Sequence, residues 1–119
     1  MTAPNIVNVT TIVGKTAVQA VTTTATAIVS NAAASNKVYK INNIIVSNVD
    51  GTNAADITVD VFRSSTAYHL AKTITVPADS TLVVLSKESA IYLEEGDSIR
   101  CTASADGDLE AFCSYEEIS

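Results

Sequence analysis

The chain has few of the residues that most catalytic and metal-binding sites need. Its 119 residues include one histidine, two cysteines, no tryptophan, four glycines and two prolines. A structural zinc site takes about four Cys or His ligands at close spacing, and one histidine with two cysteines makes only three. Two cysteines are also too few for a disulfide scaffold. We therefore expect no zinc site, no cofactor and no enzymatic activity.

Positive charge is scarce as well. Seven Lys and Arg residues stand against thirteen Asp and Glu, which gives a net charge of −6. This balance disfavours nucleic acid and anionic membrane surfaces as partners. No apolar run approaches the ~18 residues of a membrane helix, and the first residues, MTAPNIVNVT, lack the pattern of a signal peptide. We expect a protein made and kept in a cytoplasm.

The residues that are abundant favour strands. Val, Ile, Ala and Thr dominate a composition that is 47% apolar, and β-branched residues favour a pleated, half-buried surface. Short alternating runs recur between turns rich in Asn, Asp, Gly and Ser, and no run keeps a 3.6-residue period. The sequence predicts an all-β fold: one domain, residues 1–119, folded as a jelly-roll-like antiparallel β-sandwich of about eight strands.

The expected strands follow from the runs between turn signals. Residues 37–49 would form an unusually long strand, so we expect a bulge near Asn42-Asn43. The run 81–86 is apolar throughout its middle, which predicts burial on both faces. The other expected strands are 5–13 (ended by Gly14), 16–23, 24–30, 57–63, 67–76 (ended by Pro77), 90–95, 97–104 and 109–118.

The N-terminal segment, residues 1–14, fits two alternatives. It carries apolar residues but few turn signals, so it suits either the first strand or an arm that pairs with a neighbouring subunit. In the second case the candidates for subunit contact are Ile6, Val7, Val9 and Ile12.

The two C-terminal strands suggest a hairpin whose register follows from polarity. A three-residue loop, Asp106-Gly107-Asp108, gathers apolar residues on one face, whereas a two-residue turn mixes Glu110 and Ser114 into it. The opposite face is polar except for Phe112. The loop predicts three cross-strand pairs: Ile99 with Tyr115, Cys101 with Cys113, and Ala103 with Ala111. Cys101 and Cys113 would then be facing core residues, and we expect them reduced in a reducing compartment.

Two further candidates for chemistry have ordinary structural explanations. The loop DGTNAAD offers Asp50, Asn53 and Asp56 as calcium ligands, but Asp, Asn and Gly also serve turns for backbone reasons. His69 lies near serines in the sequence, yet no nucleophile motif surrounds it, so we expect it to face solvent on a strand.

Two stretches carry a resemblance to a known family: VSNVDGTNAADITVDVFRSS, and the run from AKTITVPADSTLVVL to IYLEEGDSIRCTAS and the end. From about residue 38 onward the chain resembles small virion structural proteins of tailed bacteriophages, particularly those of marine cyanobacteria. The resemblance implies a β-sandwich that decorates or cements the capsid, or that belongs to the neck, tail or fibres.

The expected function is therefore a non-enzymatic capsid decoration subunit, located in the virion after synthesis in the host cytoplasm. Its expected partners are the major capsid protein and other copies of itself, with a trimer favoured. The alternative is a neck, tail or fibre component, including a glycan-binding module for receptor recognition. That alternative predicts exposed tyrosines at a concave or loop-end site.

Overall fold

The alternating runs form nine strands in the computed structural model, which describes residues 4–119. A short 3₁₀ turn, η1 (Lys87–Ser89), lies between the sixth and seventh strands. The strands are β1 (Ile12–Ala20), β2 (Thr26–Ser30), β3 (Val38–Asn48), β4 (Ala55–Arg63), β5 (Thr66–Val76), β6 (Thr81–Leu85), β7 (Ile91–Leu93), β8 (Ser98–Ala103) and β9 (Leu109–Ile118).

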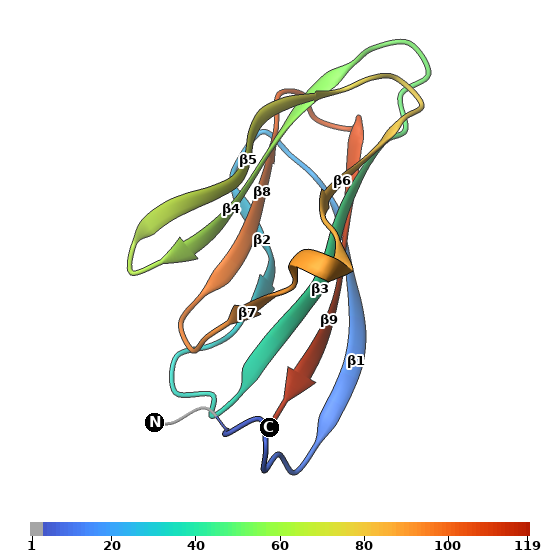
Figure 1. Ribbon diagram of the computed structural model, residues 1–119. Coiled ribbons are helices and arrows are strands. Elements are labelled where there is room, and N and C mark those ends of the chain that lie inside the picture. The colour runs from blue at the N-terminus through green and yellow to red at the C-terminus, as the bar shows by residue number, and fades with distance from the viewer. Residues whose placement is uncertain (1–3) are drawn as a thin grey trace.

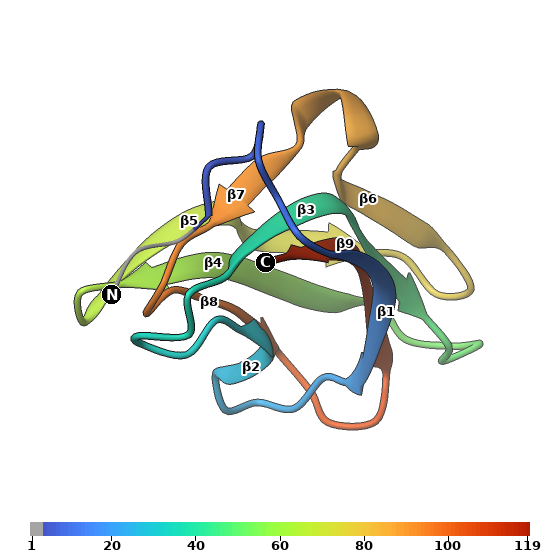
Figure 2. The same cartoon turned by 90° about the horizontal axis from the view of Figure 1, so that it is seen from below.

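The strands pack as two antiparallel sheets (Figures 1 and 2). One sheet has the order β1-β9-β3-β6, with β7 also paired to β3, and the other has the order β2-β8-β4-β5. This is the strand order of a jelly roll, so the predicted all-β sandwich is confirmed. The count is nine because β6 and β7 occupy successive parts of one edge position. β6 pairs with residues 44–47 of β3, and β7 pairs with residues 39–41.

The core consists of the inward-facing side chains of both sheets. β-Branched residues and Leu dominate it, and no tryptophan is needed to fill the space between the sheets. Period-two alternation places these side chains, as in β8, where Ile99, Cys101 and Ala103 are buried and the residues between them are partly exposed. The largest fully buried apolar side chains are Ile41, Ile44, Ile57, Leu93, Ile99, Leu109, Val21, Val46, Val59, Val76 and Cys101.

The predicted bulge in the long strand is confirmed. The register between β3 and β9 shifts between Ile41 and Asn43, so Asn42 has no partner in the ladder. An extra residue of this kind bends the strand and increases its twist, which lets the eleven residues of β3 follow the curved sheet.

The predicted C-terminal hairpin is wrong. β8 and β9 lie in different sheets: β8 pairs with β2 and β4, and β9 pairs with β1 and β3. The segment 104–108 crosses from one sheet to the other. The predicted inward faces are nevertheless correct for Cys101 and Cys113, which are both fully buried. Alternation determines which side of a strand faces the core, and a sandwich satisfies it equally well with the two strands on opposite sides of that core.

The predicted first strand at residues 5–13 is also wrong. The strand begins at Ile12 and passes through Gly14 without ending there. Asn5 explains the later start, because its side-chain oxygen accepts the N–H of Val7 (2.9 Å) and its carbonyl accepts the N–H of Asn8 (2.9 Å). Such local hydrogen bonds of Asn compete with strand formation.

The expected burial of residues 81–86 on both faces is wrong as well. β6 is an edge strand that pairs only with β3 in the described part of the chain, and the side chain of Val83 is 56% exposed. A run of apolar residues in a short strand does not distinguish an apolar core from an apolar outer surface.

Buried asparagines close the sandwich at both ends. Asn48 donates from Nδ2 to the carbonyls of Asn53 (3.0 Å) and Val76 (2.9 Å), and its Oδ1 accepts the N–H of Asp50 (2.9 Å). At the other end, Asn31 donates in the same way to the carbonyls of Lys37 and Leu93. These amides satisfy loop backbone groups that would otherwise lose hydrogen bonds on burial.

We predict that Asn48→Ala lowers the free energy of unfolding by roughly 1–3 kcal/mol, because it removes three hydrogen bonds and leaves buried backbone groups unsatisfied. Equilibrium urea unfolding measures this. Asn8→Ala, at an exposed position, is the control and should change stability by less than about 0.5 kcal/mol. Equal urea midpoints for Asn48→Ala and the wild type would contradict the role given to Asn48.

Candidate functional site

An apolar row crosses the outer face of the sheet that contains β1. Val18 lies opposite Phe112, Phe112 opposite Ile45, and Ile45 opposite Val83. Directly paired residues of antiparallel strands project on the same face, and the neighbours Ala111, Cys113, Ile44 and Val46 face the core. The four side chains therefore form one line over β1, β9, β3 and β6, which we call the outer apolar row.

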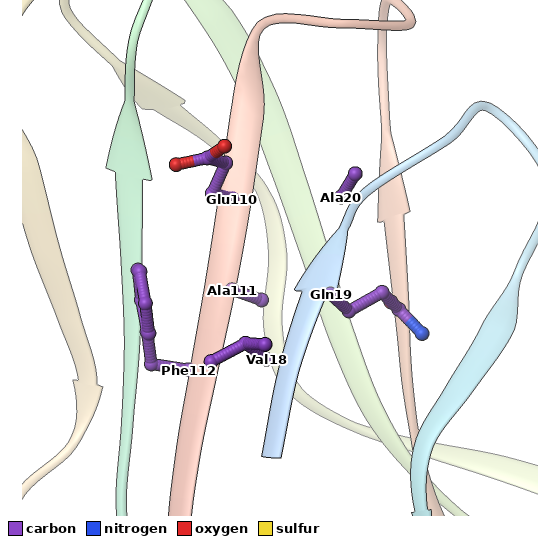
Figure 3. A pocket seen from close by; sticks show the side chains of 6 residues that line it. All are labelled: Val18, Gln19, Ala20, Glu110, Ala111 and Phe112. Carbon is purple, nitrogen blue, oxygen red and sulfur yellow. The ribbon is translucent and has the colours of Figure 1, made fainter. Parts of the chain in front are cut away.

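The outer apolar row is open to solvent at both ends. Val18 is 67% exposed and Val83 is 56% exposed, while Phe112 and Ile45 are half-buried. Figure 3 shows Phe112 reaching from β9 toward β3, with Val18 beside it between β9 and β1. The row has polar neighbours on both sides: Glu110, Ser47 and Thr81 on one side and Thr16, Ser114 and Asn43 on the other.

One residue signalled this row in the sequence. Phe112 is the apolar exception on the predicted polar face of the last strand, and that face is indeed the outer one. The other three members gave no signal, because they come from strands whose neighbours were unknown before the sheet order was known.

The N-terminal candidates for subunit contact lie close to this sheet. Ile6 (54%), Val7 (83%) and Ile12 (55%) are exposed, and Val9 is half-buried. The N–H groups of Thr10 and Thr11 both donate to the carbonyl of Ser119 (2.8 and 2.9 Å). The segment is thus held beside the end of β9 in this chain, while Ile6, Val7 and Ile12 stay exposed to solvent.

A groove opens at the mouth of the sandwich between the edge strands β5 and β7. Its walls come from β4, β5 and β7, and Tyr68 (60% exposed) and Tyr92 (45% exposed) lie on it. The volume is about 380 Å³. We call it the tyrosine groove; it is lined by Val61, Arg63, Tyr68, Leu70, Ile91 and Tyr92.

Arg63 joins the tyrosine groove to a second, polar depression. Its guanidinium donates to both carboxylate oxygens of Asp97 (2.8 and 2.5 Å) and to Glu94 (2.9 Å). These carboxylates raise the pKa of Arg63, chiefly through the hydrogen bond with Asp97. Asp97 is only 3% exposed and also accepts the N–H of Glu94, so it anchors the β7–β8 turn. The sequence gave no sign of the pairing of Asp97 with Arg63.

The outer face of the other sheet carries a second buried carboxylate. Arg100 donates to both oxygens of Asp60 (3.0 and 3.3 Å) and stacks over the ring of Phe62, with 4.0 Å from its Cζ to the ring centroid. His69 lies opposite Asp60 on β5 and is exposed, as predicted. Within residues 4–119, no hydrogen bond links His69 to a serine hydroxyl.

Glu117 ties the N-terminal strand to the sheet. It accepts hydrogen bonds from Lys15 on β1 (3.0 Å) and from Lys37 just before β3 (2.7 Å). Both lysines hold the pKa of Glu117 below its ordinary value of 4.5, first through these hydrogen bonds and then through their charge. The stacked rings of Tyr39 and Tyr115, with centroids 5.3 Å apart, belong to the same end of β3 and β9.

The calcium candidates are occupied by structural contacts. The carboxylate of Asp50 accepts the N–H groups of Thr52 (2.7 Å) and Asn53 (3.1 Å), which lowers its pKa. Asp56 lies on β4 and accepts the hydroxyl of Thr75 (2.8 Å). Among residues 4–119, no three His, Cys, Asp or Glu side chains converge as a metal-ligand group. These contacts support the turn explanation and add nothing in favour of calcium.

Cys101 and Cys113 face the core from opposite sheets and are not bonded to each other in this structure. Burial is the main reason that the pKa of each thiol is raised to about 12. A thiol of this kind is almost fully protonated near neutral pH and is a poor nucleophile and metal ligand.

We predict that Glu117→Gln destabilises the chain near neutral pH. Because the folded pKa is depressed, ionised Glu117 stabilises the fold above about pH 4.5, and this contribution is lost as the pH falls through the folded pKa. Urea unfolding across this range should show the two proteins converging at low pH. Glu88→Gln, at an exposed position outside any ion pair of the described chain, is the control. A constant difference at every pH would contradict the ion-pair explanation.

We predict that neither thiol reacts with a thiol-specific reagent in the native chain, and that both react in denaturant. The comparison of labelling rates by mass spectrometry, at neutral pH with and without urea, measures this directly. Rapid labelling of Cys101 or Cys113 under native conditions would contradict their placement in the core.

Comparisons with known proteins find a similar fold but identify no family for this chain. No family model matches the chain, and no curated protein matches it. No helix of the described residues is long and apolar enough to cross a membrane. The fold is similar to that of a solved chain from Bacillus endospore appendages, a family of disulfide-linked pili. The TM-score is 0.53 and the identity 18%, over 92% of this chain and 88% of that one. At this identity the similarity shows the jelly-roll sandwich alone.

Proposed function

We propose that this protein is a non-enzymatic structural subunit of a phage virion, and specifically a capsid decoration subunit that binds the assembled shell. The observation that carries the proposal is the outer apolar row of Val18, Phe112, Ile45 and Val83. The family resemblance from about residue 38 onward supports a place in the virion. The outer apolar row supports assembly with other proteins as the way in which the subunit works.

The row has the form expected of an interface. A contiguous apolar strip with polar neighbours on both sides resembles the apolar core and polar rim of protein contacts, and such patches on soluble proteins often mark interaction sites. The row runs the full width of its sheet, from the edge strand β1 to the edge strand β6. A flat partner surface could therefore cover it without displacing any element of the subunit.

The N-terminal segment and β1 offer a second contact. Ile6 and Val7 are exposed beside an edge strand, and β1 pairs only with β9 in the described chain. Edge strands accept another chain by strand addition. Together with the row, this surface fits a homo-oligomer with cyclic symmetry, and we favour a trimer.

The pilus neighbour is compatible with a structural role but suggests a difference in mechanism. The neighbour belongs to disulfide-linked pili. Both cysteines of this chain are buried in its core, so we propose that its assembly rests on apolar and polar contacts without covalent cross-links.

A second location in the particle remains an alternative. The same contacts would serve a neck, tail or fibre component. Copy number separates the two: a number near that of the major capsid protein means decoration, and a handful of copies means neck, tail or fibre.

We predict that the wild-type chain self-associates and joins particles, and that Val18→Lys and Val83→Lys prevent both. Each substitution would place a charge in the apolar centre of the contact, where an unpaired buried charge is costly. Both sites are more than half exposed, so the fold should be kept. Light scattering gives the mass in solution, and the protein content of purified particles gives incorporation.

Val49→Lys is the matched control, because Val49 is similarly exposed (53%) but lies outside the row. It should assemble as the wild type does. A wild-type chain that is monomeric at every concentration and absent from particles would refute the proposal, as would normal assembly of both row variants.

A further inference from the structure

We propose that the tyrosine groove binds a neutral glycan. This site is separate from the outer apolar row, so the inference goes beyond the proposed function and adds a recognition activity to a structural subunit. It rests on three features of the described residues: an unfilled apolar mouth, two exposed aromatic rings, and an adjoining polar depression.

The groove exists because the two sheets diverge at this edge. Val61 lies opposite Ile99 in β8 and opposite Tyr68 in β5, so Tyr68 projects on the core-facing side of its sheet. It is nevertheless 60% exposed, because β7 on the other sheet does not cover it. Figure 1 shows the tip of the β4–β5 hairpin standing away from the rest of the sandwich. The core is thus open here, with Val61, Leu70 and Ile91 only partly buried.

The aromatic rings suit a sugar. Tyr68 comes from one sheet and Tyr92 from the other, and both line the groove. Tyr68 projects on the core-facing side, whereas Tyr92 lies opposite Lys40 on the outer face of the edge strand β7 and contributes at the rim. The C–H faces of a pyranose pack on aromatic rings, and tyrosine adds a hydroxyl at the wet rim. Large exposed aromatics are otherwise rare in this chain: among residues 4–119, Tyr68 and Tyr92 are the exposed ones, and both line the same groove.

The adjoining depression supplies hydrogen-bonding groups and selects against anions. It shares Arg63 with the groove and also contains Glu94, Glu95 and Asp97. One guanidinium and three carboxylates leave an excess of two negative charges, and Arg63 is already paired with Asp97 and Glu94. The side chain of Glu94 is 66% exposed, so it can accept hydrogen bonds from sugar hydroxyls. A sialylated or phosphorylated ligand would be repelled.

The size of the site favours a short saccharide over a folded partner. Each depression has a volume of about 380 Å³, near the lower end of the ~300–1,000 Å³ range of small-molecule sites. A disaccharide would fill the site if one sugar ring lay in the tyrosine groove and the second lay in the polar depression on the other side of Arg63. A protein domain would instead need a broad, flat surface of the kind that the outer apolar row provides.

A glycan microarray probed with the labelled full-length chain tests the proposal, followed by NMR titration with the best neutral oligosaccharide. We expect retention on neutral glycans and amide shifts confined to β5, β7 and the 94–97 turn. Tyr68→Ala and Tyr92→Ala should each weaken binding by about tenfold through loss of the ring contact. Tyr68→Phe keeps the ring and should bind nearly as well as the wild type.

Ile74→Ala is the matched control, since Ile74 is an exposed residue of β5 (40%) outside the groove. It should bind as the wild type does. The inference is overturned if no glycan is retained, if only acidic glycans bind, if both tyrosine variants bind normally, or if a peptide occupies the groove while no glycan does. The glycan assay uses the isolated chain. A negative glycan result therefore does not contradict the proposed assembly function, and a chain that fails to assemble can still be tested for glycan binding.

Discussion

The apolar layer between the two sheets is the interaction on which every other feature depends. Facing sheets in a sandwich lie about 10 Å apart, and here β-branched side chains and two cysteines fill that space. Each fully buried aliphatic side chain contributes roughly 1.5–3 kcal/mol, and among the described residues there is neither a disulfide nor a cluster of metal-ligand side chains that would add to this term. The layer also requires closed ends, which explains why Asn31, Asn48 and Asp97 are buried polar residues: each satisfies backbone groups of the loops that cap the layer.

Both candidate surfaces exist because the apolar layer between the sheets covers only one face of each sheet and is incomplete at one edge. A sheet with one face in the core has its other face open to solvent. On the β1-β9-β3-β6 sheet this outer face carries the outer apolar row, at positions where polar residues are usual. At the β5–β7 edge the layer itself is incomplete, so side chains that face inward stay accessible in the tyrosine groove. The first surface is broad and shallow and suits another protein, whereas the second is narrow and suits a small ligand.

The sequence predicted the components of the fold better than their arrangement. Strand runs, the bulge near Asn42 and the inward faces of the last two strands depend on local alternation and turn chemistry, which a single sequence displays. The predicted pairing of those last two strands was wrong because alternation does not show in which sheet a strand lies. Cys101 and Cys113 face the core from opposite sheets instead of pairing along a ladder. The first strand was misplaced because Asn5 forms turns whose hydrogen bonds are not apparent from polarity.

The features of the candidate surfaces likewise separate into those that the sequence predicted and those that only the tertiary structure shows. By itself the sequence determined the fold class, the burial of both cysteines, the exposure of His69 and the anomaly of Phe112, since each depends on the chemistry of neighbouring residues along the chain. Only the tertiary structure decided that Phe112 lies between Val18 and Ile45, that Arg63 pairs with Asp97, and that Tyr68 and Tyr92 line one groove. The members of these pairs are 24 to 94 positions apart in the chain. The jelly-roll strand order, set by long-range hydrogen bonding between strands, brings them together.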